Sequence, residues 1–256
     1  MNKHKLKLLI TRPESAGRDL QNCLQQLGYQ SHCQPLFDYQ NSASAEQLLA
    51  LQQQTTRPIV IFISVAAVEF VNKLLPIASW STQDIIAVGS ATSQALQALG
   101  INALVPEKHD SEGLLALTPL QKVSNKDVII IRGNGGRELI AEKLHSRGAS
   151  VHYFESYRRV WRNYTNELIK TWRQQQINCI LITSNALLEF IVNLLDDSDS
   201  YWKDNCLWLV ASERIAIAAK TMGIRHIVNT NGANSKAIIN TLSREKSVDS
   251  SDIGRI

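Results

Sequence analysis

The sequence predicts an α/β protein with two similar lobes, each built on a largely parallel sheet. Three observations carry this prediction. Short apolar runs rich in β-branched residues alternate with amphipathic helical patterns along the chain. Most of these runs are apolar throughout, which is typical of strands buried on both faces of a parallel sheet. The second half of the chain also repeats segments of the first half in the same order.

These patterns define the expected elements. Strands are expected at 6–10, 59–63, 85–88, 101–105, 128–131, 179–182, 207–210 and 226–228, with longer extended pieces at 30–39 and 151–160. Helices are expected between them, including about 15–27, one through 114–120 and a last one at about 235–242. The polar stretch 243–256 is expected to be disordered.

Five segment pairs indicate an internal duplication. LLITRPESAGRDL resembles VIIIRGNGGREL, PLFDY resembles YFESY, FISVAAVEFVNKLL resembles LITSNALLEFIVNLL, AVGSATSQALQALGI resembles LVASERIAIAAKTMGI, and ALVPEKHDSEGLL resembles HIVNTNGANSKAII. They pair Arg12 with Arg132, Arg18 with Arg137, Tyr39 with Tyr157, Ser64 with Ser184, and Ser90 with Ser212. A shared strand–helix rhythm explains one such match, but five in order favour two lobes of common origin.

Charge and hydropathy narrow the function classes. The formal net charge of the 256 residues is +4 at pH 7, which suits anionic ligands but is too small and scattered to indicate nucleic acid. No segment approaches the ~20 apolar residues of a membrane span. The first residues, MNKHKLKLLI, have too short an apolar run for a signal peptide. We therefore expect a cytoplasmic protein that binds neither membranes nor nucleic acid.

The cysteines and histidines show no metal-ligand spacing. The four cysteines form no C-x-x-C pair. Cys23, Cys179 and Cys206 lie in apolar helix or strand patterns, which predicts buried free thiols. No metal site is assigned.

The stretch VIIIRGNGGREL (128–139) is the strongest candidate for a binding loop. A buried strand ends at Arg132, four residues of a glycine-rich turn follow, and Arg137-Glu138 opens a helical pattern. Backbone N–H groups of such a turn converge on one spot, and the two arginines favour carboxylate or phosphate there. No Gly-Lys-Ser/Thr follows, so the stretch is not a Walker loop. An ordinary strand-to-helix turn with a solvated arginine remains the alternative.

The other strand ends carry a similar set of polar groups. In open α/β sheets, ligands bind beyond the carboxyl ends of the strands. Those ends are Thr11-Arg12, Ser64, Gly89-Ser90, Arg132-Gly133-Asn134, Thr183-Ser184-Asn185, Ala211-Ser212 and Thr230-Asn231. They contain no Asp, Glu or Cys, which argues against magnesium-dependent phosphotransfer and for a ligand with many negative charges. The alternative is that these hydroxyls and amides only cap the following helices.

Several segments together resemble one known family. They are ITRP at 10–13, VGSAT at 88–92, IRGNGGREL at 131–139, FESYRRV at 154–160 and VASERIA at 210–216. With these segments the chain resembles uroporphyrinogen-III synthases over roughly residues 8–242. IRGNGGREL is the most specific part and closely matches bacterial members.

The resemblance implies a particular domain organisation. One flavodoxin-like lobe would combine residues 1–35 with 160–242, and residues 40–150 would form the other flavodoxin-like lobe. The extended pieces 30–39 and 151–160 would run antiparallel between the lobes as a two-stranded hinge.

The resemblance also implies the reaction. Uroporphyrinogen-III synthases close the linear tetrapyrrole hydroxymethylbilane into a ring, invert ring D and release water, without metal or organic cofactor. The acetate and propionate arms of that substrate match the donors at the strand ends. The implied partners are this small molecule and, transiently, the enzyme that makes it; we expect a monomer.

The resemblance assigns candidate site residues. Tyr157 is the candidate catalytic residue, as an acid for the departing hydroxyl, with simple packing of this aromatic ring as the alternative. The candidate substrate-binding residues are Arg12, Ser64, Ser90, Thr92, Arg132, Gly133, Asn134, Gly135, Gly136, Arg137, Ser184, Asn185 and Ser212.

Two positions depart from the family pattern. Many members carry Asn or Arg two residues after the Ser64 position, where this chain has Ala66. Many have Gly-Pro-Thr-Thr where this chain has Ala211-Ser212-Glu213-Arg214. Both departures favour substrate contacts through the backbone.

Two other function classes stay open on the residues alone. One is a two-lobed protein that binds a polyanionic small molecule without catalysis, which predicts binding but no conversion. The other is a flavodoxin-like nucleotide or phosphate sensor that uses the glycine turn, which predicts nucleotide binding in a thermal-shift screen.

Overall fold

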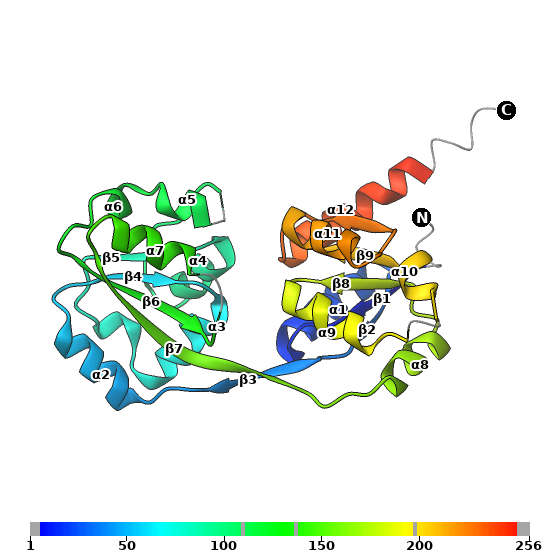
Figure 1. Cartoon of the computed structure of the whole chain (residues 1–256), viewed down its shortest axis with the longest axis horizontal. Helices are drawn as coiled ribbons and strands as arrows, with labels where there is room; N and C mark the ends of the chain where they lie inside the picture. The colour runs from blue at the N-terminus through cyan, green and yellow to red at the C-terminus, as the bar shows by residue number, and fades with distance from the viewer. Residues whose placement is uncertain (1–5, 109–110, 136–137, 197–198, 250–256) are drawn as a thin grey trace. The chain divides into compact units, whose positions relative to one another are not determined.

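A computed structural model describes residues 6–108, 111–135, 138–196 and 199–249 of the chain. It divides into two compact units (Figure 1). Unit 1 comprises Met1–Asp38 and Trp161–Ile256, and unit 2 comprises Tyr39–Val160. The chain passes from unit 1 to unit 2 through β3 (Phe37–Asn41) and returns through β7 (Ser150–Trp161).

Unit 1 contains a five-stranded sheet in the order β10-β9-β8-β1-β2, whose neighbouring strands are all parallel. The strands are β1 (Lys7–Ile10), β2 (Gln30–Cys33), β8 (Cys179–Ile182), β9 (Leu207–Val210) and β10 (Ile227–Asn229). The helices are α1 (Glu14–Gln26), α8 (Glu167–Gln174), α9 (Asn185–Leu194), α10 (Tyr201–Asp204), α11 (Glu213–Thr221) and α12 (Ser235–Asp249). All four residues of β8 are buried, which explains why this strand is apolar throughout.

Unit 2 contains a sheet in the order β3-β7-β6-β4-β5. Its further strands are β4 (Ile59–Phe62), β5 (Asp84–Ala87) and β6 (Asp127–Gly133), and β7-β6-β4-β5 are mutually parallel. Its helices are α2 (Ala45–Gln54), α3 (Val65–Leu74), the 3-10 turn η1 (Ile77–Ser79), α4 (Ser90–Gln97), α5 (Ser111–Leu115), α6 (Thr118–Gln121) and α7 (Leu139–Ser146).

The sheet of unit 2 is covered by apolar side chains on both faces. Alternate residues of β4 and β6 point into two different clusters: Val60 and Ile129 into one, Ile61 and Ile130 into the other. Strands covered on both faces need apolar residues at every position. The prediction of an α/β protein with parallel sheets is confirmed.

Most of the repeated segments occupy matching places in the two sheets. The strands β2-β1-β8-β9 of unit 1 correspond in order to β7-β6-β4-β5 of unit 2. Beside β9 lies a fifth strand, β10, and at the corresponding place beside β5 lies only a single parallel bridge at Leu104. Four of the five pairs of resembling segments lie at the same sheet position, so the two units share one strand arrangement. The fifth pair differs, because PLFDY lies at β3 and YFESY in β7, and these strands are neighbours in the sheet of unit 2.

Some expected extended segments differ in the structure. The piece 30–39 is broken at Pro35, which lacks an N–H group and has a fixed φ. Its first half, β2, pairs with β1 inside unit 1 rather than acting as a linker. The strand expected at 101–105 is only the bridge between Leu104 and Ile86, because Ile101 turns into the core.

Some expected helices also differ. The helix through 114–120 is two short helices, α5 and α6, because Pro119 in the first turn of α6 cannot continue a preceding helix. The last helix runs to Asp249 rather than Leu242, since 243–249 contain no glycine or proline and polar helix formers suffice to extend it. Residues 243–249 are thus helical, and the disorder expected for the tail stays a prediction for 250–256, which lie outside the described residues.

The four cysteines are free thiols, and one prediction about them is wrong. Cys179 and Cys206 are buried as expected, whereas Cys23 is exposed. Leu20 and Leu24 are the side chains that α1 buries, and Cys23 points away from them toward solvent. Burial raises the pKa of the Cys179 and Cys206 thiols, which lowers their thiolate fraction.

We predict that iodoacetamide modifies one thiol rapidly in the native protein at pH 8. That thiol is Cys23, because the thiolate is the nucleophile and the other three cysteines are buried. Mass spectrometry of timed samples checks the site, and Cys23→Ser should remove the rapid phase. Rapid native modification of Cys179 would contradict the described core.

Candidate active site

Helix N-termini at the carboxyl ends of parallel strands form the framework of the site. Ser64 follows β4 and accepts a hydrogen bond from the backbone N–H of Ala67 at 3.1 Å, and Ser184 follows β8 and accepts one from Leu187 at 3.3 Å. Both serines cap their helices, as the alternative interpretation held. Ser212 occupies the same place before α11, but its side chain makes no capping hydrogen bond.

Two hydroxyls near β5 are presented differently. Ser90 is exposed at the start of α4, whereas Thr92 is 4% exposed. Thr92 points into unit 2 because the first turn of α4 rotates it toward the sheet. The structure therefore does not present Thr92, a predicted substrate-binding residue, to a ligand.

A β-bulge beside the glycine turn sets the position of Tyr157. Arg132 pairs with Glu155, but Gly133 pairs with Tyr157, so the register between β6 and β7 shifts at this point. The N–H of Asn134 donates to the carbonyl of Tyr157 at 2.9 Å. The side-chain oxygen of Asn134 then accepts from the N–H of Arg159 at 2.9 Å. The turn and β7 are thus fastened together around Tyr157.

Gly133 is required by a close approach of the Tyr157 ring. A Cβ at this position would lie 2.5 Å from Cε2 and 2.6 Å from Cζ of that ring. No side chain fits there while the ring stays in place. The absence of a side chain at Gly133 therefore leaves the space that the phenol ring occupies.

The phenol of Tyr157 lies at the N-terminus of α3. Its oxygen is 2.9 Å from Oγ of Ser64, and either atom can be the donor. The ring packs edge-on against Tyr39, with centroids 4.7 Å apart, and against Phe70 at 5.6 Å. A phenol held at the positive end of a helix can donate a proton or a hydrogen bond to a negatively charged oxygen.

Arg132 lies in a different environment from the one expected. Its side chain is 7% exposed, and Nη1 lies 3.1 Å from Oε1 of Glu138 while Nε lies 3.8 Å from Oε1 of Glu155. Its guanidinium carbon is 4.5 Å from the centre of the Tyr153 ring. The strand ends carry no acid in sequence, but the fold brings two carboxylates to this arginine.

The turn itself already holds an anion. The N–H of Gly135 donates to Oε1 of Glu155 at 3.2 Å, and Gly135 has a φ of +68° that favours glycine. The prediction that this turn suits a carboxylate agrees with this contact, although the carboxylate belongs to the chain. Gly136 and Arg137, also predicted site residues, lie outside the described residues.

Tyr153 and Glu138 form the outer part of this network. The hydroxyl of Tyr153 donates to Glu138 Oε2. Burial raises the pKa of Tyr153 to about 12, and the hydrogen bond to Glu138 adds to this rise. The same hydrogen bond, followed by that from Arg132, lowers the pKa of Glu138. At neutral pH the pair is therefore a phenol and a carboxylate.

Sequence reasoning missed Glu138, Glu155 and Tyr153 as site residues. A signal for two of them was present, because Tyr153 and Glu155 are two residues apart on one strand and so share a face. Glu138 gave no such signal, because it reaches Arg132 only through the way the turn folds back.

The predicted residues of unit 1 lie at neighbouring strand ends. Arg12 follows β1, Ser184-Asn185 follows β8, and Ser212 follows β9, in a sheet where these strands are adjacent. Oδ1 of Asn185 is buried without a hydrogen-bond partner in the described part of the chain. Arg12, a half-buried side chain, and Asn185 therefore remain candidates for ligand contact.

Two other strand-end hydroxyls of unit 1 are structural. Thr11 donates to the carbonyl of Leu181 at 2.9 Å, and Thr230 donates to that of Gly232 at 2.7 Å. Both threonines are buried. Their hydroxyls satisfy the backbone rather than a ligand.

The described residues contain neither a metal-binding cluster nor a membrane-spanning helix. No group of three or more His, Cys, Asp or Glu side chains in the described ranges is arranged to hold a metal ion. No helix in the part of the chain that the structure describes is long and apolar enough to cross a membrane.

Comparisons with known proteins agree with one another. The family model described as "Uroporphyrinogen-III synthase HemD" matches residues 18–240. The uroporphyrinogen-III synthase of Escherichia coli K12 is 32% identical over 248 residues, covering 93% of this chain and 100% of that protein. The Salmonella typhimurium enzyme of the same name is 31% identical over 245 residues, with 93% and 100% covered.

A solved structure supports the fold. A crystal structure of a mutant uroporphyrinogen III synthase from the extreme thermophile Thermus thermophilus has a TM-score of 0.62 to this chain at 13% identity, covering 93% of this chain and 99% of that one. At this identity the likeness concerns the fold. Since the family model spans most of the sequence and close relatives match along nearly their whole length, this chain belongs to the uroporphyrinogen-III synthase HemD family.

Proposed function

We propose that this chain cyclises hydroxymethylbilane to uroporphyrinogen III, with inversion of ring D and loss of water. Family membership supports the reaction, and one observation of the structure supports the assignment of its chemistry. That observation is the phenol of Tyr157, held 2.9 Å from Ser64 at the N-terminus of α3.

The first proposed step is departure of the substrate's hydroxyl from ring A. The carbon–oxygen bond breaks, the hydroxyl takes a proton from Tyr157 and leaves as water, and an azafulvene cation remains. A phenol O–H group can act as this donor. The hydrogen bond from Ser64 and the dipole of α3 stabilise the phenolate as it forms.

The later steps need position more than further chemistry. Ring D attacks the azafulvene through its substituted carbon, the spiro intermediate fragments, and ring D recloses turned over. Proton loss at ring D returns the proton that Tyr157 gave. Closure without inversion competes, and suppressing it a hundredfold takes only ~3 kcal/mol of differential stabilisation. A few charge-assisted hydrogen bonds at ~1.5–3 kcal/mol each suffice.

Each unit by itself offers hydrogen-bonding groups at its strand ends, and we propose these groups as candidates for binding the substrate. In unit 2 they come from Ser64, Ser90, Arg132 and the backbone of the glycine turn, and in unit 1 from Arg12, Ser184, Asn185 and Ser212. For Arg132 and the turn, we propose an exchange in which a substrate carboxylate replaces Glu155. The 3.8 Å separation between Arg132 Nε and Glu155 Oε1 supports this, because so long a pairing is weak.

The finer description of the fold is also part of the proposal. We propose that both units are flavodoxin-like, which the order β2-β1-β8-β9-β10 supports because it follows the 2-1-3-4-5 pattern. We further propose that β3 and β7 form an antiparallel hinge. The N–H of Ser42 donates to the Ser156 carbonyl, and the N–H of Arg162 donates to the Leu36 carbonyl. Residue numbers therefore increase along one segment as they decrease along the other, which is the pattern of antiparallel pairing.

Tyr157→Phe should lower turnover about 10- to 100-fold, because the proton donor is lost while the ring still packs against Gly133. The free energy of unfolding should fall by no more than ~1.5 kcal/mol, the usual value of one hydrogen bond. A coupled assay with hydroxymethylbilane measures turnover, and Tyr39→Phe is the matched control. Unchanged turnover in Tyr157→Phe would remove this residue from the mechanism.

Gly133→Ala should lower turnover at least as much, because the new methyl group meets the Tyr157 ring and displaces its hydroxyl from Ser64. Gly100→Ala is the control: nothing lies within 4 Å of its added Cβ, but its φ of +77° is strained. Both variants should lose stability in urea unfolding, and only Gly133→Ala should lose activity. Equal activity in both would refute the role of Gly133.

Glu155→Gln should lower KM several-fold at similar kcat, because the substrate no longer competes with an internal carboxylate for Arg132 and Gly135. Glu142→Gln, an exposed change on α7 in the same unit, is the control for loss of one negative charge. A KM that is unchanged, or that rises, would show that the Glu155 contact is structural only.

A further inference from the structure

Unit 2 contains a hollow of about 440 Å³ at the opposite end of its sheet from the candidate active site. Residues of this hollow lie just before the strands: Pro58 directly precedes β4, and Thr82 lies two residues before the start of β5. The candidate active site lies after the strands. A four-residue strand separates the two by roughly 13 Å.

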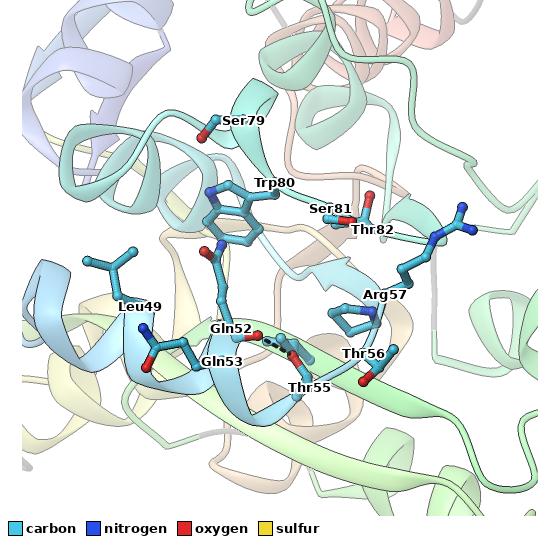
Figure 2. A pocket seen from close by; sticks show the side chains of 12 residues that line it. Leu49, Gln52, Gln53, Thr55, Thr56, Arg57, Ser79, Trp80, Ser81 and Thr82 are labelled. Carbon is cyan, nitrogen blue, oxygen red and sulfur yellow. Dashed lines mark hydrogen bonds between the residues drawn. The ribbon is translucent and has the colours of Figure 1, made fainter.

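The walls of the hollow differ from side to side (Figure 2). Leu49, Gln52 and Trp80 lie together on one side, where the amide end of Gln52 points toward the indole of Trp80. Arg57 lies on the other side, beyond Ser81 and Thr82. The hollow thus has a flat apolar wall and a cationic rim.

The apolar wall contains two donors that have no acceptor. Nε1 of Trp80 and Nε2 of Gln52 are buried and make no hydrogen bond within the described part of the chain. A buried donor without an acceptor costs ~1–3 kcal/mol, and native structures keep few of them. An acceptor atom supplied from outside the chain would satisfy both groups.

Two other indoles help to judge this observation. Nε1 of Trp172 and of Trp202 are also without partners, but both side chains are fully buried in unit 1. Trp80 differs because it is only partly buried and lines a hollow that a ligand can enter.

The charged side chains that line the hollow are of one sign only. The twelve lining residues include one cation, Arg57, and no Asp or Glu. Nearby hydroxyls are partly engaged: Thr55 donates to the carbonyl of Leu51 at 3.1 Å and Ser79 to that of Pro76 at 2.7 Å. A carboxylate does stand at the edge of the lining, where Asp127 accepts from the N–H of Thr56 at 3.0 Å. The two buried donors without a partner, together with Arg57, favour an anion in the hollow itself.

We propose that this hollow, lined by Leu49, Gln52, Arg57, Pro58, Trp80 and Thr82, is a second binding site that takes a small flat molecule carrying carboxylates. The aromatic ring of the ligand packs on Trp80 and Leu49. One carboxylate accepts from Trp80 Nε1 and Gln52 Nε2, and a second pairs with Arg57. The volume falls within the ordinary range for small-molecule pockets, ~300–1,000 Å³.

Naphthalene-2,6-dicarboxylate is a suitable probe, because it is flat and carries a carboxylate at each end. The chain has five tryptophans, so a ¹H–¹⁵N spectrum of the whole protein should show five indole signals. Trp80→Phe assigns one of them by its disappearance. We expect the probe to shift the Trp80 indole signal and to leave that of Trp208, which donates to the Trp202 carbonyl at 2.7 Å.

Two comparisons make the test decisive. Arg57→Gln should weaken binding of the probe about tenfold, as expected for loss of a charge-assisted contact. Lys143→Gln, which removes one exposed positive charge from α7 in the same unit, should not weaken it. The neutral naphthalene-2,6-dicarboxamide should bind far more weakly than the dicarboxylate.

Three results would overturn the proposal. They are an unmoved Trp80 signal at millimolar dicarboxylate, equal binding of the dicarboxamide, and equal affinity of Arg57→Gln and Lys143→Gln. Because binding is read at Trp80 without substrate turnover, the result does not depend on whether the chain cyclises hydroxymethylbilane.

Discussion

The candidate active site of unit 2 depends on a missing side chain at Gly133. Because this residue has no Cβ, the Tyr157 ring can lie directly against the backbone of β6, where any other residue would collide with it. The β-bulge at the same point shifts β7 so that Tyr157 is the residue that meets this glycine. The hydrogen bond to Ser64 and the edge-on contact with Tyr39 then fix the ring. A single small residue thus determines where the phenol oxygen lies.

The electrostatics of the site follow from how the turn satisfies its own polar groups. A buried guanidinium without carboxylate partners is costly, so Glu138 and Glu155 lie against Arg132. Their side chains are half exposed, which leaves them free to move into solvent when another anion arrives. The site is therefore a set of donors occupied by internal carboxylates, rather than an open cationic surface. This arrangement favours ligands with several carboxylates, since each must displace an existing partner.

The two units share a strand arrangement but differ where chemistry is proposed. Phe70 of α3 packs against Tyr157, and the corresponding Phe190 of α9 stacks on Trp161, with ring centres 4.4 Å apart. The first pair presents a phenol beside a helix N-terminus, and the second presents an indole without an acidic hydroxyl. After a duplication, unit 2 can retain the proton donor, whereas in unit 1 the equivalent contact between two aromatic rings serves only to pack the strand. The asymmetry is consistent with a reaction that needs one acid.

The sequence by itself determined the α/β class, the apolar strands, the duplication, the serines at helix N-termini and the family, because these depend on local periodicity and on residue identity. It did not determine where Glu138 and Glu155 lie, because their pairing with Arg132 requires two strands and a turn to meet. The sequence also did not show that the piece 30–39 is two strands, β2 in the sheet of unit 1 and then β3. An edge strand and an extended linker have the same alternation of apolar and polar residues, so the pattern does not separate them. The exposure of Cys23, the burial of Thr92 and the hollow before β4 and β5 were likewise decided only by the tertiary structure. Each depends on the packing of a helix on its sheet, which residue spacing alone does not specify.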